Sequence, residues 1–475
     1  MTIFPESLTR QSTISTETLA RQLNGRLIQP GDDEYDAARA VWNGMIDRYP
    51  ALIVRAANVD DVVTAVTFAR AHNLLLSVRG GGHQVAGHAT NDGGLVLDLS
   101  QMRQVTVDPQ ARIAHVQGGA TIGDVDQATQ QFGLVTPLGV VTETGIAGLT
   151  LGGGFGHLRN KYGLSLDNVV EAEVVLADGR VVIANAGEHA DLFWGLRGGG
   201  GNFGVVTRFT YRLHEIGTGV YATAVFHDGR HAEEIMRFFR DYTLAAPDEI
   251  SLLAAIGVFP PGVAHFPAEL HGQPFVLLIG AYAGDPAHGE QVMAPLRSFR
   301  RPLLDFSGVM PYLELQKFFD EDYPAGELRY YWKSLNLTDL SDQAIGVLVE
   351  HARRQPSVLS TTDVWHIGGA VPRVAEEETA FHGRHVNFLV NPEANWEDPA
   401  DDAANMRWAW AMLEGLRPFS DGSRYLNFAG FQEEGDAMMQ DAFAAKYQRL
   451  AELKARYDPT NLFRLNQNIK PTHPL

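Results

Sequence analysis

Glycine clusters constrain the fold of this chain more than any other feature of its sequence. In the first cluster, Gly80, Gly81 and Gly82 follow an apolar run and precede His83. Because glycine has no Cβ, the backbone can turn sharply here, and its N–H groups can approach an anionic pyrophosphate closely. The cluster therefore predicts a phosphate cradle with a nucleophilic histidine beside it. The alternative is a glycine turn that carries a surface histidine.

A second glycine-rich region covers residues 139–156. Glycine inside a regular helix or strand costs about 0.5–1 kcal/mol per residue, so this region predicts an irregular backbone wrapped around something flat or phosphorylated. A flexible linker is the alternative. Val140, Ile146, Leu149 and Leu151 argue against a linker, because they are core residues rather than the serines of a flexible tract.

A third cluster, residues 199–204, fits the letters of the G-x-G-x-x-G dinucleotide motif. A Rossmann fingerprint lies between a strand and a helix. Here a predicted short helix at 191–196 precedes the glycines, and an alternating strand at 205–211 follows them. We therefore do not interpret this cluster as a nicotinamide site.

The remaining patterns predict an α+β protein with more than one domain, as its 475 residues also suggest. Residues 1–215 combine short β-branched strands with an amphipathic helix after Asn58, a good N-cap, and a hairpin at Asp178-Gly179. From about residue 216 glycine thins out, and strands alternate with helices, which indicates an antiparallel sheet with helices on one face. The predicted strands are 221–226, 250–259, 275–283, 361–367 and 386–390, and the predicted helices are 231–244, 285–296, 341–353 and 402–416. A helix at 441–457 and a polar tail close the chain, so we divide it into 1–215, 216–423 and 424–475.

Composition excludes several classes of function. A formal net charge of −19 disfavours nucleic acid and anionic membranes as partners. The chain has no cysteine, which rules out disulfides, thiolate metal sites, a Cys nucleophile and any cysteinyl cofactor link. We predict no metal site. Residues Met1 to Gln11 lack a basic start followed by an apolar run, and no apolar stretch of about 18 residues occurs, so we expect a soluble, cytoplasmic protein.

Four separated motifs, in order, carry a resemblance to a known family. They are Arg79-Gly80-Gly81-Gly82-His83, residues 145–156, residues 192–204 and residues 457–463. From about residue 40 to its end the chain resembles the berberine bridge enzyme-like FAD-linked oxidases, and most closely the bacterial ones. The resemblance implies a two-lobed PCMH-type FAD-binding domain, closed by the C-terminal tail, with a substrate domain inserted.

The resemblance also implies a covalent bond from the flavin 8α-methyl group to His83. Many relatives add a cysteine bond to flavin C6 at the position of Val141, which this cysteine-free chain cannot form. We therefore expect a single histidyl link. The residues expected around the FAD are Arg79, Gly80, Gly81, Gly82, His83, Gln84, Gly87, His88, Val140, Val141, Gly145, Gly148, Gly152, Gly153, Gly154, Gly156, Val205, Val206, Asn427 and Asn466.

The usual catalytic base of the family does not carry over. Sugar and cannabinoid oxidases have a motif resembling Tyr-x-Asn-Tyr, in which the last tyrosine is the base, but here Phe428 follows Asn427 and cannot take a proton. Residues 384–390, where some plant enzymes carry a catalytic glutamate, are mostly apolar. Tyr331 and His366, on predicted strands, are our candidate bases, with Asn427 beside them. The alternatives are that Tyr331 is a core aromatic and His366 a satisfied polar strand residue.

The expected function is a flavoprotein oxidase that takes hydride from a small alcohol, amine, sugar or secondary metabolite and passes electrons to O₂, giving H₂O₂. Two alternatives remain open: a dehydrogenase with a quinone or other acceptor, and a flavin-binding protein without turnover. The expected partners are a small-molecule substrate and O₂.

Overall fold

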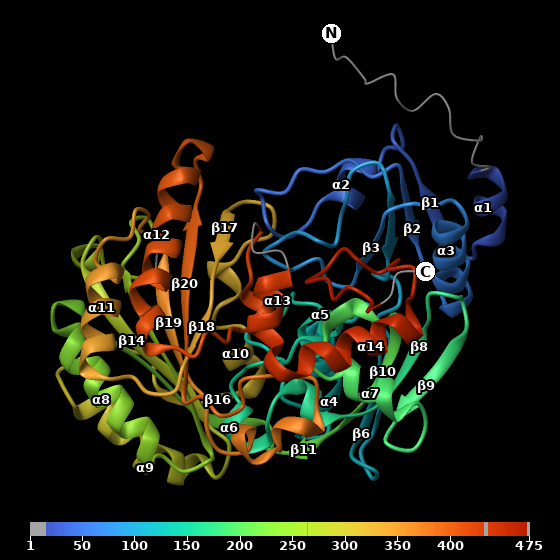
Figure 1. Ribbon diagram of the computed structural model, residues 1–475. Coiled ribbons are helices and arrows are strands. Elements are labelled where there is room, and N and C mark those ends of the chain that lie inside the picture. The colour runs from blue at the N-terminus through green and yellow to red at the C-terminus, as the bar shows by residue number, and fades with distance from the viewer. Residues whose placement is uncertain (1–15, 264, 432–435, 473–475) are drawn as a thin grey trace.

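The computed structural model describes residues 16–263, 265–431 and 436–472 (Figure 1). The prediction about Met1 to Gln11 concerns residues outside these ranges. The first and last residues of the predicted division into 1–215, 216–423 and 424–475 also lie outside them. A four-stranded sheet forms the first lobe, in the order β1 (Arg26–Ile28), β2 (Leu52–Arg55), β4 (Leu95–Asp98) and β3 (Leu76–Arg79). β2, β4 and β3 are parallel, as α3 (Val59–Ala71) connects β2 to β3 across one face. The Asn58 side chain caps α3 by accepting from the Asp61 N–H.

A five-stranded antiparallel sheet forms the second lobe. Its order is β5 (Val105–Asp108), β6 (Ile113–Gln117), β10 (Val205–Arg212), β8 (Val169–Val175) and β9 (Val181–Asn185). β8 and β9 pair across the predicted turn at Asp178-Gly179. The helices of this lobe are α4 (Ile122–Gln130), α5 (Ile146–Leu151), α6 (Arg159–Tyr162) and α7 (Ala190–Leu196).

A nine-stranded sheet dominates the other half of the molecule, and all its pairings are antiparallel. Its main path runs β15 (Leu304–Asp305), β12 (Gly219–Asp228), β14 (Pro274–Tyr282), β13 (Ile250–Val258), β19 (Thr361–His366), β20 (Phe388–Trp396) and β17 (Arg329–Trp332). Two short strands join it at the side, β16 (Gly308–Pro311) and β18 (Leu335–Leu337). Helices α8 (Ala232–Ala245), α9 (Pro286–Ser298), α11 (Asp342–Ala352) and α12 (Asp402–Leu416) cover one face (Figure 1).

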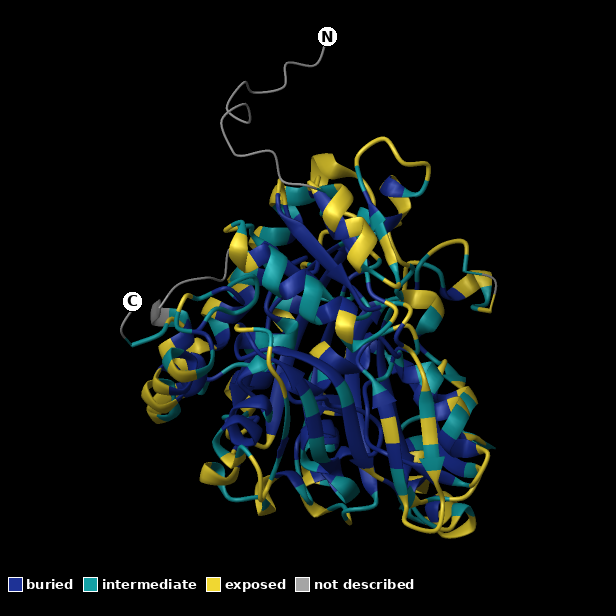
Figure 2. Cartoon of the chain, turned by 90° about the vertical axis from the view of Figure 1, so that its right-hand side faces the viewer, coloured by how far each residue is buried: buried dark blue, intermediate teal, exposed yellow. Residues whose placement is uncertain are grey.

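Side chains alternate between the two faces of these strands, so each face packs into a different hydrophobic core. Leu252 of β13 and Val364 of β19 pack with the covering helices, whereas their neighbours Leu253 and Trp365 pack with Phe155 of the lobes. Buried residues are concentrated in the interior of the molecule (Figure 2). The nine-stranded sheet therefore presents one face to helices and the other to the glycine-rich half, and the α+β prediction is confirmed.

The C-terminal segment returns to the two lobes. α13 (Asp436–Phe443) and α14 (Tyr447–Tyr457) pack on the second lobe, and Leu462 and Phe463 enter the core of the first. The single helix predicted at 441–457 is wrong, because the chain breaks at Ala444, where φ is +46°. Strand β20 also extends six residues beyond the predicted 386–390. No helix in the described part of the chain has the length and apolar character that crossing a bilayer requires.

Candidate functional site

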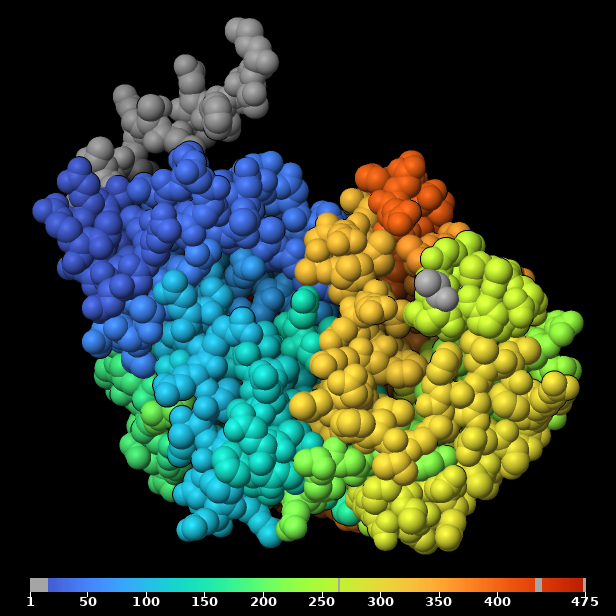
Figure 3. Space-filling view, turned by 180° about the vertical axis from the view of Figure 1, so that it is seen from behind, coloured from blue at the N-terminus to red at the C-terminus, as the bar shows by residue number. Residues whose placement is uncertain are grey.

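A deep cavity lies where the glycine loops meet the open face of the nine-stranded sheet. Its walls come from all three glycine clusters, from strands β13, β17, β19 and β20, and from the C-terminal tail. Seen from behind, the blue-to-teal and yellow-to-orange halves of the chain meet side by side, with a hollow between them at the upper edge (Figure 3). The cavity thus joins parts of the chain that are far apart in sequence.

His83 stands in the glycine-rich wall, at the end of the loop after β3. Its ring stacks on Trp42 at 4.2 Å between centroids and 16° between planes, and Trp42 stacks in turn on Tyr330 at 3.7 Å. The Nε2 atom is buried and has no hydrogen-bond partner. Burial lowers the pKa of His83 to about 4, so the imidazole is neutral at pH 7 and keeps the lone pair that a nucleophile needs.

The glycine-rich wall fits an FAD. Gly148 lines the cavity, and a Cβ atom added there would meet nothing within 4 Å, so any side chain would project into the open space. Gly82 has a φ of +69°, which favours glycine. The buried Oδ1 atom of Asn466 also lines this space without a partner. Small residues, exposed backbone and unpaired polar atoms are the features expected around a dinucleotide cofactor.

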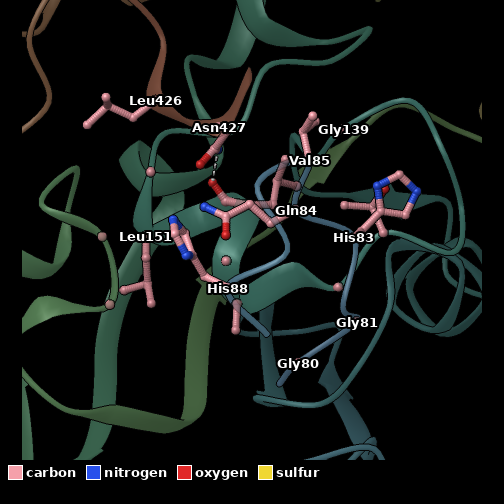
Figure 4. Close-up of a pocket in the computed structure, with 18 of the residues that line it drawn as sticks. Gly80, Gly81, His83, Gln84, Val85, His88, Gly139, Leu151, Leu426 and Asn427 are labelled. Atoms are coloured by element: carbon pink, nitrogen blue, oxygen red, sulfur yellow. Dashed lines mark hydrogen bonds between the residues drawn. The ribbon is translucent and has the colours of Figure 1, made fainter. Parts of the chain in front are cut away.

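Most residues expected around the FAD lie in this wall. Those that line the cavity are Gly80, Gly81, Gly82, His83, Gln84, His88, Val140, Val141, Gly145, Gly148, Gly152, Val205, Val206, Asn427 and Asn466. Figure 4 shows part of this set, with the rings of His83 and His88 at opposite sides of the view. Their contact with a cofactor stays a prediction.

Five of the expected residues do not line the cavity. Arg79 turns away and donates from Nη1 to the Ala38 carbonyl at 2.6 Å. The other four, Gly87, Gly153, Gly154 and Gly156, are glycines for reasons of packing and backbone conformation. A Cβ atom on Gly156, for example, would lie 1.7 Å from the Leu138 carbonyl oxygen. The structure thus gives these five residues other roles, and their contact with the FAD stays a prediction.

The sheet side of the cavity carries two carboxyl groups that the sequence analysis missed. Asp363 and Trp365 project from β19, and Glu393 projects from the adjacent β20. Glu393 Oε2 accepts a hydrogen bond from the Tyr323 hydroxyl at 2.5 Å, and its Oε1 accepts from Asn391. The Oδ1 atom of Asp363 is buried and has no partner. Asp363 therefore lines the cavity and has one acceptor atom without a hydrogen-bond partner.

These two carboxyl groups are held in an environment that favours protonation. Burial raises the pKa of Asp363 to about 7. Burial, together with the negative charge of Asp363, raises the pKa of Glu393 well above its usual value. No lysine or arginine is among the described residues that line the cavity. The pair can therefore hold and release a proton near neutral pH.

Tyr331 and His366 do not reach the cavity, and we correct their assignment as candidate bases. The Tyr331 hydroxyl accepts from Trp410 Nε1 at 2.8 Å, within the core beneath the covering helices. The His366 ring bonds to Asn160 at 3.1 Å, and burial lowers its pKa to about 3. These contacts favour the alternatives, a core aromatic for Tyr331 and a satisfied polar strand residue for His366. The predicted strands are right, but the inward side chains are the neighbours Trp332 and Trp365.

Asn427 and Phe428 both line the cavity. Asn427 Nδ2 donates to the Leu149 carbonyl at 2.9 Å and to the Tyr425 hydroxyl at 2.8 Å, which ties the C-terminal segment to the second glycine region. The Phe428 ring packs edge-on against Trp332 at 5.8 Å. The position of the usual tyrosine base thus lies in the cavity, but here it is apolar.

Comparisons with known proteins identify relatives that are FAD-linked. The FAD binding domain family matches residues 50–185, and the "berberine and berberine like" family matches residues 424–470. The chain is 30% identical to the FAD-linked oxidoreductase YgaK of Bacillus subtilis, over 95% of this chain and 98% of that one. It is also 30% identical to (R)-6-hydroxynicotine oxidase of Paenarthrobacter nicotinovorans, over 94% and 97% of the two chains. The crystal structure of 6-hydroxy-D-nicotine oxidase from Arthrobacter nicotinovorans superimposes with a TM-score of 0.84 at 28% identity, covering 94% of this chain and 98% of that one.

Proposed function

Because this chain belongs to the berberine bridge enzyme-like family of FAD-linked oxidoreductases, we propose that it is an oxidase with FAD bound covalently through His83. One observation supports this most strongly: a single cavity joins the neutral His83, in a wall of glycines, to Asp363 and Glu393 on the opposite sheet. When bound, FAD supplies a hydride acceptor whose electrons can pass to O₂ to give H₂O₂. The carboxyl pair supplies the proton chemistry that hydride removal requires.

Three residues of this chain take the place of the absent tyrosine base. Glu393 accepts a proton from the substrate O–H or N–H, and Tyr323 orients the Glu393 carboxyl group through the 2.5 Å hydrogen bond. Asp363, on the adjacent strand, shares the proton with Glu393. A carboxyl pair with raised pKa values can accept a proton near pH 7, whereas Phe428 cannot.

The glycine-rich wall also supports reaction with oxygen. Thr144 lines the cavity beside Val141 and Gly145, and its small side chain leaves room for O₂. Val141 cannot form a second tether, so the whole covalent attachment falls on His83. The small side chain of Thr144 therefore favours an oxidase over a dehydrogenase that excludes oxygen.

Acid precipitation tests the covalent link. The wild-type protein keeps its yellow colour in the acid precipitate, and His83→Ala releases the flavin into the supernatant. His88→Ala is the matched control, because His88 also lines the cavity and burial also lowers its pKa to about 4; it keeps the covalent colour. Free flavin from the wild type would overturn the tether, and less than one peroxide per turnover would favour another acceptor.

A further inference from the structure

We propose that the substrate is a cationic amine, whose ammonium group is held by Asp363 and Glu393 inside a ring of aromatic side chains. This inference rests on the proposed function, because it takes the sheet side of the cavity as the substrate end. It goes further in naming one substrate class among the alcohols, amines, sugars and secondary metabolites that a flavin oxidase can use.

The hydrogen-bond inventory of the two carboxyl groups leaves room for a donor. Asp363 is 4% exposed and Glu393 is 3% exposed, so both face the cavity rather than bulk water. Both oxygens of Glu393 accept from protein donors, Tyr323 and Asn391. Asp363 Oδ1 has no protein partner. A buried acceptor without a donor is costly, and an ammonium N–H from the substrate satisfies it.

The charged side chains that line the cavity also favour a cationic ligand, because they are carboxyl groups. Two buried cations near the sheet make other contacts: Arg159 donates to the carbonyls of Leu252 and His366 and lies over the Trp365 ring at 5.1 Å, and Lys333 lies 4.3 Å from the Tyr331 ring on the helix-covered side. The carboxyl pair therefore faces a cavity whose described lining holds no cationic side chain. A cationic ligand supplies the positive charge that this lining lacks.

Aromatic rings complete a site suited to an ammonium ion. Trp332 lies edge-on to Tyr323 at 5.4 Å and to Phe428 at 5.8 Å, and Phe428 lies 6.3 Å from Trp365. All four line the cavity. Ring faces attract cations, most strongly in desolvated sites, and the flat walls also accept an apolar body attached to the amine.

Acidic residues lie next to this site along the chain. The short 3-10 helix Asp320–Asp322 carries three carboxyl groups and is flanked by Phe319 and Tyr323, which both line the cavity. Its Asp320 holds the second glycine region by accepting from the Thr142 N–H at 2.8 Å. A negative field at this position raises the local concentration of cations.

Binding of an ammonium ion also changes the protonation of the pair. Tyr323 and Asp322 act on the pair from the sheet side, and the titratable groups that line the glycine side of the cavity are His83 and His88. Both histidines are neutral at pH 7, because burial lowers their pKa values to about 4. The incoming positive charge therefore replaces the proton shared by Asp363 and Glu393, and that proton leaves to solvent.

Isothermal titration of the flavin-loaded protein with benzyltrimethylammonium and, separately, with benzyl alcohol tests the inference. We expect the cation to bind about tenfold or more tightly than the neutral alcohol. Asp363→Asn and Glu393→Gln each weaken binding of the cation by about tenfold or more and weaken binding of the alcohol much less. Glu327→Gln is the matched control, since it removes one exposed carboxyl group of the same region outside the cavity lining; it changes neither affinity.

The same titration in two buffers of different ionisation enthalpy counts protons. Release of a proton on binding of the cation at pH 7, absent in Glu393→Gln, supports the inference. Equal affinity for the two probes, or binding of neither, overturns it. Failure of the proposed function looks different: a protein that carries no flavin absorbance, or whose flavin no substrate reduces, contradicts the oxidase even if the cation binds.

Discussion

Gly81 and Gly145, from the first and second glycine regions, pack backbone against backbone. A Cβ atom on Gly81 would lie 2.3 Å from the Gly145 nitrogen, and a Cβ atom on Gly145 would lie 2.2 Å from the Gly81 nitrogen. Because both partners are backbone, no side-chain rotation can relieve either contact. The two loops that form the glycine-rich wall therefore hold each other in place at this one point.

Gly145→Ala is expected to push the two loops apart. We expect the free energy of unfolding to fall by about 1–3 kcal/mol, as for overpacking elsewhere, and the bound flavin per protein to fall with it. Urea denaturation and the visible absorbance of the purified protein measure the two effects. Gly346→Ala is the control, because a Cβ atom there, on α11, meets nothing within 4 Å. An alanine at 145 that keeps stability and flavin would contradict the packing argument.

Arg384 and Asp167 join the two halves of the molecule through a buried ion pair. Arg384 Nη2 lies 2.6 Å from Asp167 Oδ1, and Nη1 lies 3.1 Å from Oδ2; the arginine is 2% exposed. Arg384→Met leaves a buried carboxylate without its partner, so we expect a loss of about 3–5 kcal/mol in the free energy of unfolding. Guanidinium denaturation measures it.

The double variant Arg384→Met, Asp167→Asn checks the cause of that loss. Because it removes both charges, it is expected to recover most of the stability lost in Arg384→Met. If the losses in the free energy of unfolding simply add in the double variant, the two side chains act independently.

Much of the fold could be predicted because its elements carry strong local signals. The α12 helix begins and ends where the apolar spacing places it, at Asp402 and Leu416, and Asn58 caps α3 as expected. The break at Ala444 has no such signal, since its left-handed backbone depends on how α13 and α14 pack on the second lobe. Tertiary packing overrides local propensity there.

The candidate site was harder to predict, because it depends on which face of each strand points inward. Periodicity gives the alternation along β19, so Asp363 and Trp365 share a face, but it does not say which face meets the glycine loops. Glu393 was missed for another reason. Pro392 precedes it and argues against a strand, yet β20 continues past the proline, opposite the break between β17 and β18.

Asp126 links the second lobe to α10 (Tyr312–Gln316) and makes stability depend on pH. Its Oδ2 accepts from Gln316 Nε2 at 2.8 Å, its Oδ1 has no partner, and burial raises its pKa from 3.8 to about 7. Between these pH values the folded state binds more protons than the unfolded state, so stability falls as pH rises.

Asp126→Asn removes that dependence. We expect the variant to gain stability relative to wild type as pH rises from 4 to 7, by at most about 4 kcal/mol, and no further above pH 8. Thermal unfolding across this pH range measures the difference. Asp33→Asn, at an exposed position, is the control and shifts the melting temperature equally at every pH. A gain in the Asp126 variant that is independent of pH would contradict the raised pKa.

Variants at Glu393 and Phe428 distinguish the proposed base, Glu393, from the tyrosine that is the usual base of the family. If Glu393 accepts the proton, Glu393→Gln slows anaerobic flavin reduction by about 10²-fold or more, as for loss of a general base. It also flattens the rise in rate between pH 5 and 8 that deprotonation of the pair gives the wild type, since burial raises the pKa of Asp363 to about 7. Tyr323→Phe removes only the 2.5 Å hydrogen bond, so it shifts this pH profile and keeps part of the rate.

Phe428→Tyr restores the phenol found in relatives at a position that already lines the cavity, and it does not rescue Glu393→Gln. Stopped-flow absorbance with the best substrate from an amine and alcohol panel measures all four proteins. Full activity in Glu393→Gln, or rescue by the tyrosine, would assign the proton transfer to another group.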